Sequence, residues 1–60
     1  MQIRVVKVFH TDNSWTEFRG IRECCVGQYG ELYIFHYEGT LCAVFSREQW
    51  MNYKFETKVE

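Results

Sequence analysis

Apolar and β-branched residues recur along the chain in short runs that are separated by polar or glycine-containing segments. The first run, IRVVKVFH at residues 3–10, ends at the polar cluster of residues 11–14. The pattern resumes at residues 15–18, is interrupted at Gly20, and continues over residues 21–26 as far as the GQYG segment at 27–30. Runs of this composition favour β-strands, and a glycine between two of them is typical of a bulge or a sharp bend.

A β-hairpin is predicted where residues 31–37 and 40–46 flank Glu38-Gly39, a two-residue loop with glycine at a position that needs positive φ. Its register places successive side chains on opposite faces. One face carries Leu32, Ile34, Leu41, Ala43 and Phe45, with His36 opposite Leu41. The other carries Tyr33, Phe35, Tyr37, Cys42 and Val44, with Tyr37 opposite Thr40 and Phe35 opposite Cys42. Neither face is polar, so we expect a core on one side and a fold-over, a subunit contact or a ligand on the other.

The last part of the chain combines a capping signal with a charged strand. Ser46 and Gln49 have capping-box spacing, which predicts a single helical turn through Trp50 and Met51. Beyond this turn, apolar or β-branched residues alternate with charged ones. They are Tyr53, Phe55, Thr57 and Val59, alternating with Lys54, Glu56, Lys58 and Glu60. The alternation predicts a strand with one wet face, whose charges also protect a sheet edge.

Composition limits both the size and the setting of the fold. The 60 residues are 47% apolar and carry a net charge of −1, which fits one domain over 1–60 and favours neither anionic nor cationic partners. A chain of this size buries only about 60% of its unfolded surface, so its core needs support. Three cysteines, two of them adjacent, indicate reduced thiols in a cytoplasmic protein rather than disulfides. We therefore expect self-association as a homodimer or larger assembly.

Together these elements predict an all-β antiparallel meander of five to six strands, with one helical turn before the last strand. This arrangement resembles the small barrels of the SH3-like type, in which a helical turn joins the final two strands. A strongly bent open sheet that completes itself across a two-fold axis fits the same elements. The apolar stretches are too short to span a membrane, and no membrane partner is expected.

A second resemblance rests on an opening strand at Ile3-Arg4-Val5-Val6, the glycine hairpin Tyr37-Glu38-Gly39-Thr40, and the apolar strand Ala43-Val44-Phe45 that leads to Trp50. In these features the chain is similar to short all-β proteins encoded by bacteriophages and other bacterial mobile elements. The resemblance implies a protein that binds a host component, as an inhibitor of a host protein would, and does not act by catalysis.

Metal binding and catalysis are both disfavoured by residue spacing. The five cysteines and histidines include no Cys-x2-Cys or His-x3-His pair. Cys25 or Cys42 with His36 would be the choice for a nucleophile and its base, but a chain this small rarely encloses a substrate pocket. A phosphate-binding glycine loop is also absent. We expect no enzyme, no metal and no cofactor.

Aromatic side chains are the candidate binding residues. Tyr33, Phe35 and Tyr37 on alternate positions predict an apolar face that contacts another subunit or a protein partner. A nucleotide or single-stranded nucleic acid stacked on the same rings is the alternative, with phosphates bound by Arg19, Arg22 and Arg47. Trp15 and Trp50 lie at strand margins. Trp50 is expected either to close the end of the core or to anchor a partner.

Overall fold

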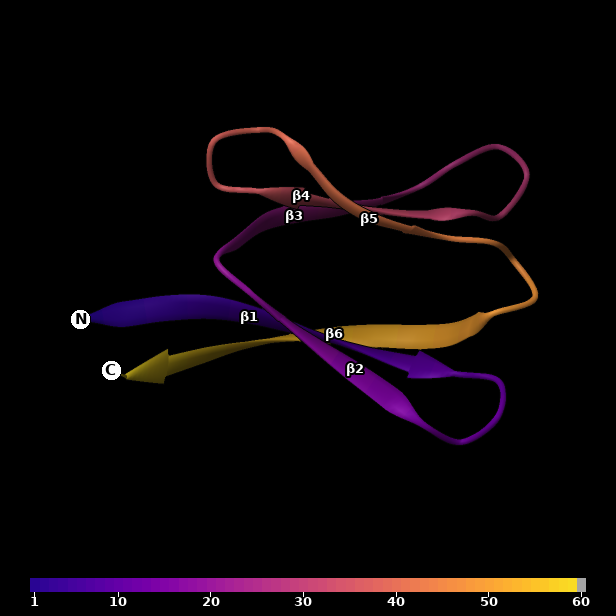
Figure 1. Ribbon diagram of the computed structural model, residues 1–60, viewed down its shortest axis with the longest axis horizontal. Coiled ribbons are helices and arrows are strands. Elements are labelled where there is room, and N and C mark those ends of the chain that lie inside the picture. The colour runs from indigo at the N-terminus through magenta and orange to yellow at the C-terminus, as the bar shows by residue number, and fades with distance from the viewer. Residues whose placement is uncertain (60) are drawn as a thin grey trace.

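Two three-stranded antiparallel sheets account for the extended segments of the chain. The computed structural model describes residues 1–59, and within them every regular element is a β-strand. The strands are β1 (Gln2–His10), β2 (Trp15–Arg19), β3 (Ile21–Val26), β4 (Leu32–His36), β5 (Leu41–Phe45) and β6 (Trp50–Val59). One sheet has the order β2-β1-β6 and the other β3-β4-β5, and Figure 1 shows them as two layers. The predicted all-β class and the upper strand count are confirmed.

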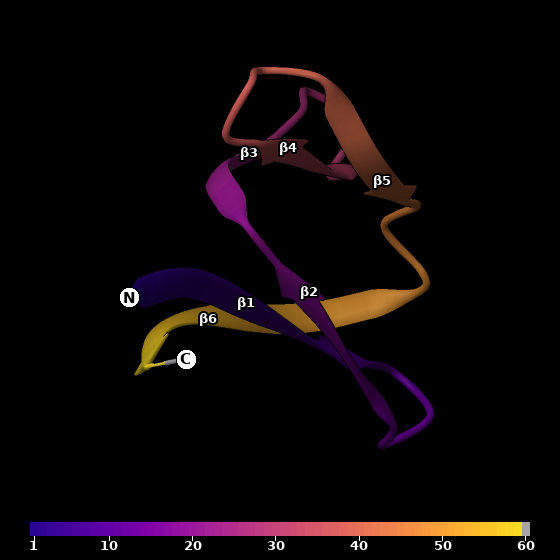
Figure 2. The same cartoon turned by 60° about the vertical axis from the view of Figure 1, so that its left-hand side comes forward.

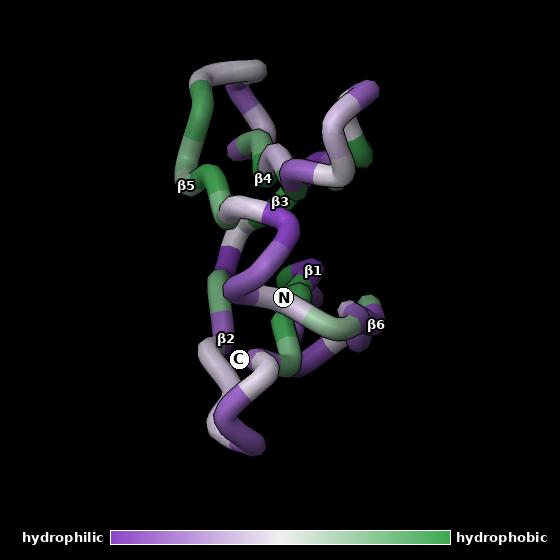
Figure 3. Tube along the Cα trace, turned by 90° about the vertical axis from the view of Figure 1, so that its right-hand side faces the viewer, coloured by the Kyte–Doolittle hydropathy of each residue, from purple (hydrophilic) through white to green (hydrophobic). Residues whose placement is uncertain are grey.

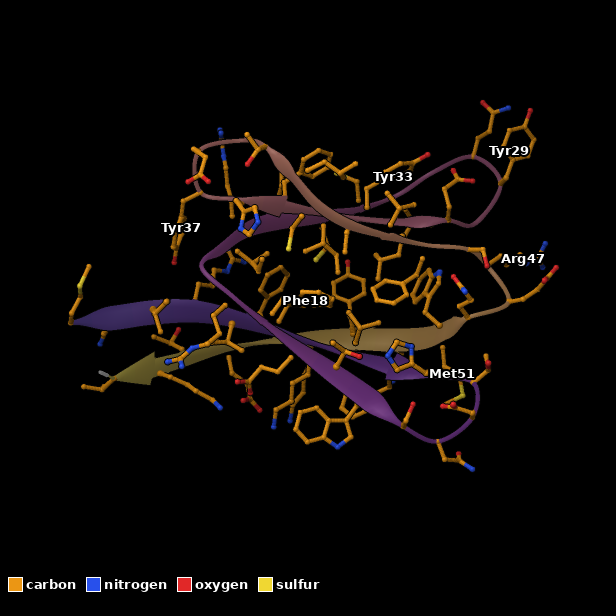
Figure 4. All side chains as sticks on the ribbon, viewed as in Figure 1. Phe18, Tyr29, Tyr33, Tyr37, Arg47 and Met51 are labelled. Atoms are coloured by element: carbon orange, nitrogen blue, oxygen red, sulfur yellow. The ribbon has the colours of Figure 1, made fainter. Side chains whose placement is uncertain are left out.

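The core lies between the layers. Val6 and Val8 on β1 are fully buried against Ile21, Leu32 and Ile34, which are fully buried in the other sheet. Partly buried side chains surround these five, and Phe18 lies between the sheets in Figure 4. The other members of this surrounding shell are Cys24, Cys42, Ala43, Phe45, Trp50, Tyr53 and Phe55. Strand alternation explains most of this selection, because every second side chain of a regular strand points toward the opposite layer, and register shifts in β3 and β5 account for Cys24 and for the adjacent Cys42 and Ala43.

The three hairpins are built on one loop design of three residues. His10, Gly27 and His36 each donate a backbone N–H to the carbonyl four residues later, at 2.8, 2.8 and 2.9 Å. Their own carbonyls accept the N–H of the third loop residue, which is Asn13, Gly30 or Gly39. That residue has φ of 73°, 83° or 90°, the left-handed conformation expected after a tight turn in such loops. The loops therefore need glycine or asparagine at one position each.

This loop design changes the predicted register of the β4–β5 hairpin. Its loop contains Tyr37 as well as Glu38 and Gly39, so the predicted two-residue loop and the pairing of Tyr37 with Thr40 are wrong. The predicted pairs Leu32 with Phe45, Tyr33 with Val44 and Ile34 with Ala43 are confirmed. Between these two regions the register shifts by one residue, and Phe35 pairs with Leu41 and not with Cys42.

Cys42 is the extra residue at this register shift, and it changes which side chains face the core. Cys42 and the next residue, Ala43, both pack toward the core. Leu41, predicted on the core face, is 53% exposed. A bulge of this kind places two residues of one strand opposite one of its partner, which reverses the alternation beyond it. Leu41 and Cys42 therefore occupy the faces opposite to those predicted.

The sheets stay open, so the predicted SH3-like barrel is wrong. The chain crosses between the layers at Gly20, whose φ is 71°, and again over residues 46–49 (Figure 2). After the second crossing β6 pairs with β1, the first strand of the chain, and not with β5. Four strands are consequently sheet edges, namely β2, β3, β5 and β6.

The helical turn predicted at Ser46 is also wrong. Gln49 donates its backbone N–H to the carbonyl of Ser46, and its side-chain Oε1 accepts the N–H of Ser46, at 2.9 Å each. One half of the capping box is thus present, but β6 begins at Trp50 and leaves no room for a helix. The alternation of β6 is confirmed where Tyr53 and Phe55 pack on the core, whereas Val59 is 78% exposed. Glu60 lies outside the described residues.

Replacement of Gly39 tests the loop design. Gly39→Ala is expected to lower the free energy of unfolding by about 1 kcal/mol, because a Cβ disfavours positive φ even where there is space for it. Gly39→Asn should cost less, since Asn13 occupies the equivalent position of the first loop. Urea denaturation of both variants measures the difference. Equal stability of Gly39→Ala and the parent chain would contradict the loop assignment.

Candidate functional site

The outer face of the β2-β1-β6 sheet is covered by charged side chains. Lys58 on β6 donates Nζ to Oε1 of Glu17 on β2 at 2.8 Å. Glu17 pairs with Lys7 of β1, and Lys58 pairs with Ile3 of β1. The ion pair therefore crosses β1 over Val5, which lies between these two β1 residues. Val5 is fully buried although it does not belong to the core cluster. The aliphatic stems of long charged side chains therefore cover Val5 on this face.

A second group of charges continues this cover along the sheet. Lys54 and Lys7 lie 3.3 and 3.6 Å from the carboxylate oxygens of Glu56. The hydrogen bond from Lys54 lowers the pKa of Glu56, and the charge of Lys7 acts in the same direction. The Lys7 Nζ also lies 4.9 Å from the ring centroid of Trp15, which is 54% exposed at the start of β2. Trp15 thus belongs to the charged side of the molecule.

The outer face of the β3-β4-β5 sheet is apolar instead. Strand pairing places Tyr33 between Cys25 and Val44, and Phe35 next to Leu41. We call these five residues the apolar face. Val44 is 46% exposed, and Cys25 is also exposed. A Cβ at Gly27 would overlap the Glu31 carboxylate and meet the Tyr33 ring at 3.0 Å, so this glycine makes room for both side chains against the sheet. The only charged residue in these two rows is Glu23, opposite Phe35 at the edge.

Tyr37 does not join this aromatic row, because it lies in the three-residue loop. Its hydroxyl accepts the backbone N–H of Arg4 at 3.0 Å, and its own N–H donates to the carbonyl of Gly20 at 3.2 Å. Gly20 in turn donates its N–H to the carbonyl of Arg4 at 2.9 Å. Tyr37 therefore ties the β4–β5 loop to the other sheet. Two of the three predicted aromatics, Tyr33 and Phe35, remain together on one surface.

Trp50 lies at the opposite end of the molecule from Tyr37 and closes the core there. Its indole Nε1 donates to the carbonyl of Gly30 at 3.0 Å, and its ring lies 6.2 Å from that of Tyr53. Gly30 belongs to the β3–β4 loop, so this hydrogen bond links the two sheets. The contacts of Trp50 are those of a side chain that plugs the end of a core.

The three arginines proposed as anion contacts do not gather at one place. Arg22 approaches Gly39, with its Nη1 3.7 Å from the position of an added Cβ. The stem of Arg47 lies 3.0 Å from the corresponding position at Gly30. Because Gly30 and Gly39 flank opposite ends of β4, the two arginines lie at opposite ends of that sheet (Arg47 is labelled in Figure 4). Arg19 is exposed on the edge strand β2 of the other sheet.

A polar cavity of about 370 Å³ opens between the β1–β2 loop and the 46–49 turn, and residue spacing gave no sign of it. It is lined by His10, Thr11, Asp12, Ser14, Phe45, Glu48 and Gln49. His10 Nδ1 lies 3.2 Å from the carbonyl of Gln49, and Nε2 lies 2.7 Å from the hydroxyl of Thr16. A carbonyl only accepts, so Nδ1 donates its proton to Gln49, and Nε2 shares a hydrogen bond with the Thr16 hydroxyl. Both ring nitrogens are thus used structurally.

The loop beside this cavity is held by its own hydrogen bonds. The hydroxyl and the backbone N–H of Ser14 both donate to Asp12, and these bonds lower the pKa of the Asp12 carboxyl. Thr11 donates its hydroxyl to the carbonyl of Glu48 at 2.8 Å. The cavity is therefore a seam between two turns, whose polar groups connect β1 to the 46–49 turn.

The thiols differ in their surroundings. Burial raises the pKa of Cys24 to about 11, and the adjacent Cys25 adds to this effect. Burial also raises the pKa of Cys42. All three cysteines are free, and residues 1–59 contain no group of three histidine, cysteine or acidic side chains arranged to hold a metal ion. A buried thiol of high pKa is a poor nucleophile, so Cys24 and Cys42 behave as small apolar side chains.

Comparison with protein-family models, curated protein sequences and solved structures found no match to this chain. Over the described residues, no helix is long and apolar enough to cross a membrane.

Alanine substitution of the two tryptophans separates a core role from a surface role. Trp50→Ala is expected to lower the free energy of unfolding by about 3 kcal/mol, because it removes a large packed ring and leaves the Gly30 carbonyl without its donor. Trp15→Ala is the matched control and should cost below about 1 kcal/mol, since its ring is half exposed. Chemical denaturation measures both. Similar losses for the two variants would contradict these placements.

Thiol alkylation tests the burial of Cys24. At mildly alkaline pH we expect Cys25 to react first and Cys24 most slowly, as read by mass spectrometry of the labelled peptides, because the thiolate is the reacting form. The raised pKa of Cys24 also stabilises the fold below the unfolded thiol pKa of about 8.5, and this contribution is lost as the pH rises through about 11. Replacement of Cys24 by alanine should remove that part of the alkaline loss. Equal labelling rates for Cys24 and Cys25 would refute the assignment.

Proposed function

We propose that this protein is a non-catalytic binding module that engages a protein partner, one to one, through the apolar face. The observation that carries this proposal is the contrast between the two outer faces. One carries the charged side chains of Lys7, Glu17, Lys54, Glu56 and Lys58, and the other presents the half-exposed Leu41 and Val44 beside the partly buried rings of Tyr33 and Phe35. Contiguous exposed apolar side chains on small proteins mark sites of contact.

Several features favour a protein partner for this face. Aromatic side chains are enriched at the centres of protein interfaces, and Tyr33 and Phe35 occupy the central strand of the sheet. Leu41 and Val44 flank them on β5, where each is about half exposed. The resemblance to short all-β phage proteins favours a partner from a bacterial cell, in which binding would block the activity of a host protein.

Binding of a nucleotide or single-stranded nucleic acid is supported less well. Tyr33 and Phe35 could stack on bases, but such sites combine stacking rings with a positive groove. Here the rows of the apolar face hold Glu23 and no basic residue, and Arg22 and Arg47 lie at opposite ends of the sheet. Catalysis has no support from the cavity, because both nitrogens of His10 are engaged in hydrogen bonds.

A capture experiment with a matched control tests the proposal. The immobilised chain is incubated with bacterial lysate at low and at high salt, and bound proteins and nucleic acids are identified. Phe35→Glu should abolish capture of the specific partner by placing a charge in the centre of the apolar face. Val59→Glu introduces the same charge at an exposed position of the other sheet and should leave capture unchanged.

The salt response and the two variants together decide the outcome. A protein retained at high salt by the parent chain and by Val59→Glu, but lost from Phe35→Glu, supports the proposal, provided that circular dichroism shows both variants folded. Binding of an oligonucleotide that falls steeply with salt would favour the nucleic-acid alternative. A partner captured equally by folded Phe35→Glu and the parent chain would refute the role of the apolar face.

A further inference from the structure

The edge strand β5 differs in charge from the three other sheet edges. Its sequence LCAVF contains no charged residue, and the strand is green along its length in Figure 3. The other edges contain at least two charged residues each. These are Glu17 and Arg19 on β2, Arg22 and Glu23 on β3, and Lys54, Glu56 and Lys58 on β6. Charged side chains and bulges both protect an edge against pairing with another chain; β5 has the bulge at Cys42 but no charged residue.

The bulge gives residues 41–44 of β5 an orientation pattern that is symmetric about the midpoint of Cys42 and Ala43. Leu41 and Val44 point to the outer face, where they are 53% and 46% exposed, while Cys42 and Ala43 between them both pack toward the core. Residues directly opposite each other in an antiparallel pair must lie on the same face. Pairing about the midpoint of residues 42 and 43 sets 41 opposite 44 and 42 opposite 43. In a regular strand the members of each pair would lie on different faces, but with the bulge they lie on the same face.

We propose that β5 pairs antiparallel with β5 of a second copy of this chain, about a two-fold axis between Cys42 and Ala43. Leu41 then lies opposite Val44 of the second copy, and Cys42 opposite Ala43 of the second copy. Each half-exposed aliphatic side chain of the strand acquires an apolar neighbour, and like charges do not meet. Any other centre within residues 41–44 opposes an inward to an outward side chain, or pairs a shorter part of the strand.

The dimer would join the two β3-β4-β5 sheets into one six-stranded sheet. Its two apolar faces would become continuous across the axis, and the uncharged edges would disappear from the surface. Small domains bury a low fraction of their surface on folding, and association increases that fraction. A 60-residue chain is therefore stabilised by such pairing. This inference concerns the β5 edge and stands whether or not the apolar face binds a further protein.

Sedimentation equilibrium over a range of concentrations tests the pairing. The parent chain is expected to sediment at twice its 7.3 kDa mass. Val44→Lys should give a monomer, because it introduces a charge opposite Leu41 of the second copy. Val59→Lys makes the same change at the β6 edge and should remain dimeric. Phe35→Glu, on the central strand of the sheet, should also remain dimeric, and this separates edge pairing from face-to-face packing.

Amide hydrogen exchange of the parent chain covers the case in which Val44→Lys fails to fold. Slower exchange of the edge amides of β5 at higher protein concentration, without the same change in β2, supports the pairing. A parent chain that stays monomeric at high micromolar concentration overturns it. So does a dimer that survives in folded Val44→Lys but is lost in folded Phe35→Glu, since that result places the contact on the apolar face.

Discussion

The packing of two β1 valines against three aliphatic side chains of the other sheet is the interaction on which the structure depends. Val6 and Val8 lie on the central strand of one layer, and Leu32 and Ile34 lie on the central strand of the other. Ile21, directly after the crossing at Gly20, completes the cluster. Because these strands commit alternate side chains to the shared core, each sheet also acquires one outer face, and what covers that face decides what the molecule can contact.

The two outer faces carry different kinds of side chain. The ion pair between Glu17 and Lys58 crosses β1 and covers Val5, which is fully buried. Exposed ion pairs of this kind add little to stability, so their main effect here is to present a polar surface. The β3-β4-β5 sheet has no comparable cover over Tyr33 and Phe35 within the described residues. The molecule is therefore two-sided, with one face suited to water and the other to contact.

The sequence pattern predicts the strands well because each strand is read from local alternation. The pattern predicts the three hairpin loops less well, because Asn13, Gly30 and Gly39 have the same role but different neighbouring residues. A loop one residue longer than predicted then requires the bulge at Cys42 to restore the register. The local residue pattern gives no sign of this bulge, and the regular register therefore predicted Leu41 on the core face.

Long-range pairing limited the prediction of topology and of the candidate site. Whether the sheets close depends on β6 returning to β1, a choice that alternation in either strand does not determine. Tyr33 and Phe35 could be assigned to one face from the hairpin alone. The hydrogen bonds of Tyr37 to Arg4 and of Trp50 to Gly30 connect segments far apart in the sequence. The side chains of Tyr37 and Trp50 therefore hold the two sheets together, which local pattern does not predict.

The most direct test of this two-sided account compares the solvent exposure of single side chains on the two outer faces. A soluble paramagnetic probe broadens the methyl resonances that it can approach. We expect strong broadening for Val44 and little for Val5, although both lie on outer faces, because charged side chains cover Val5. Broadening of Val5 equal to that of Val44 would show that Val5 on the β2-β1-β6 face is not covered, and would contradict the account.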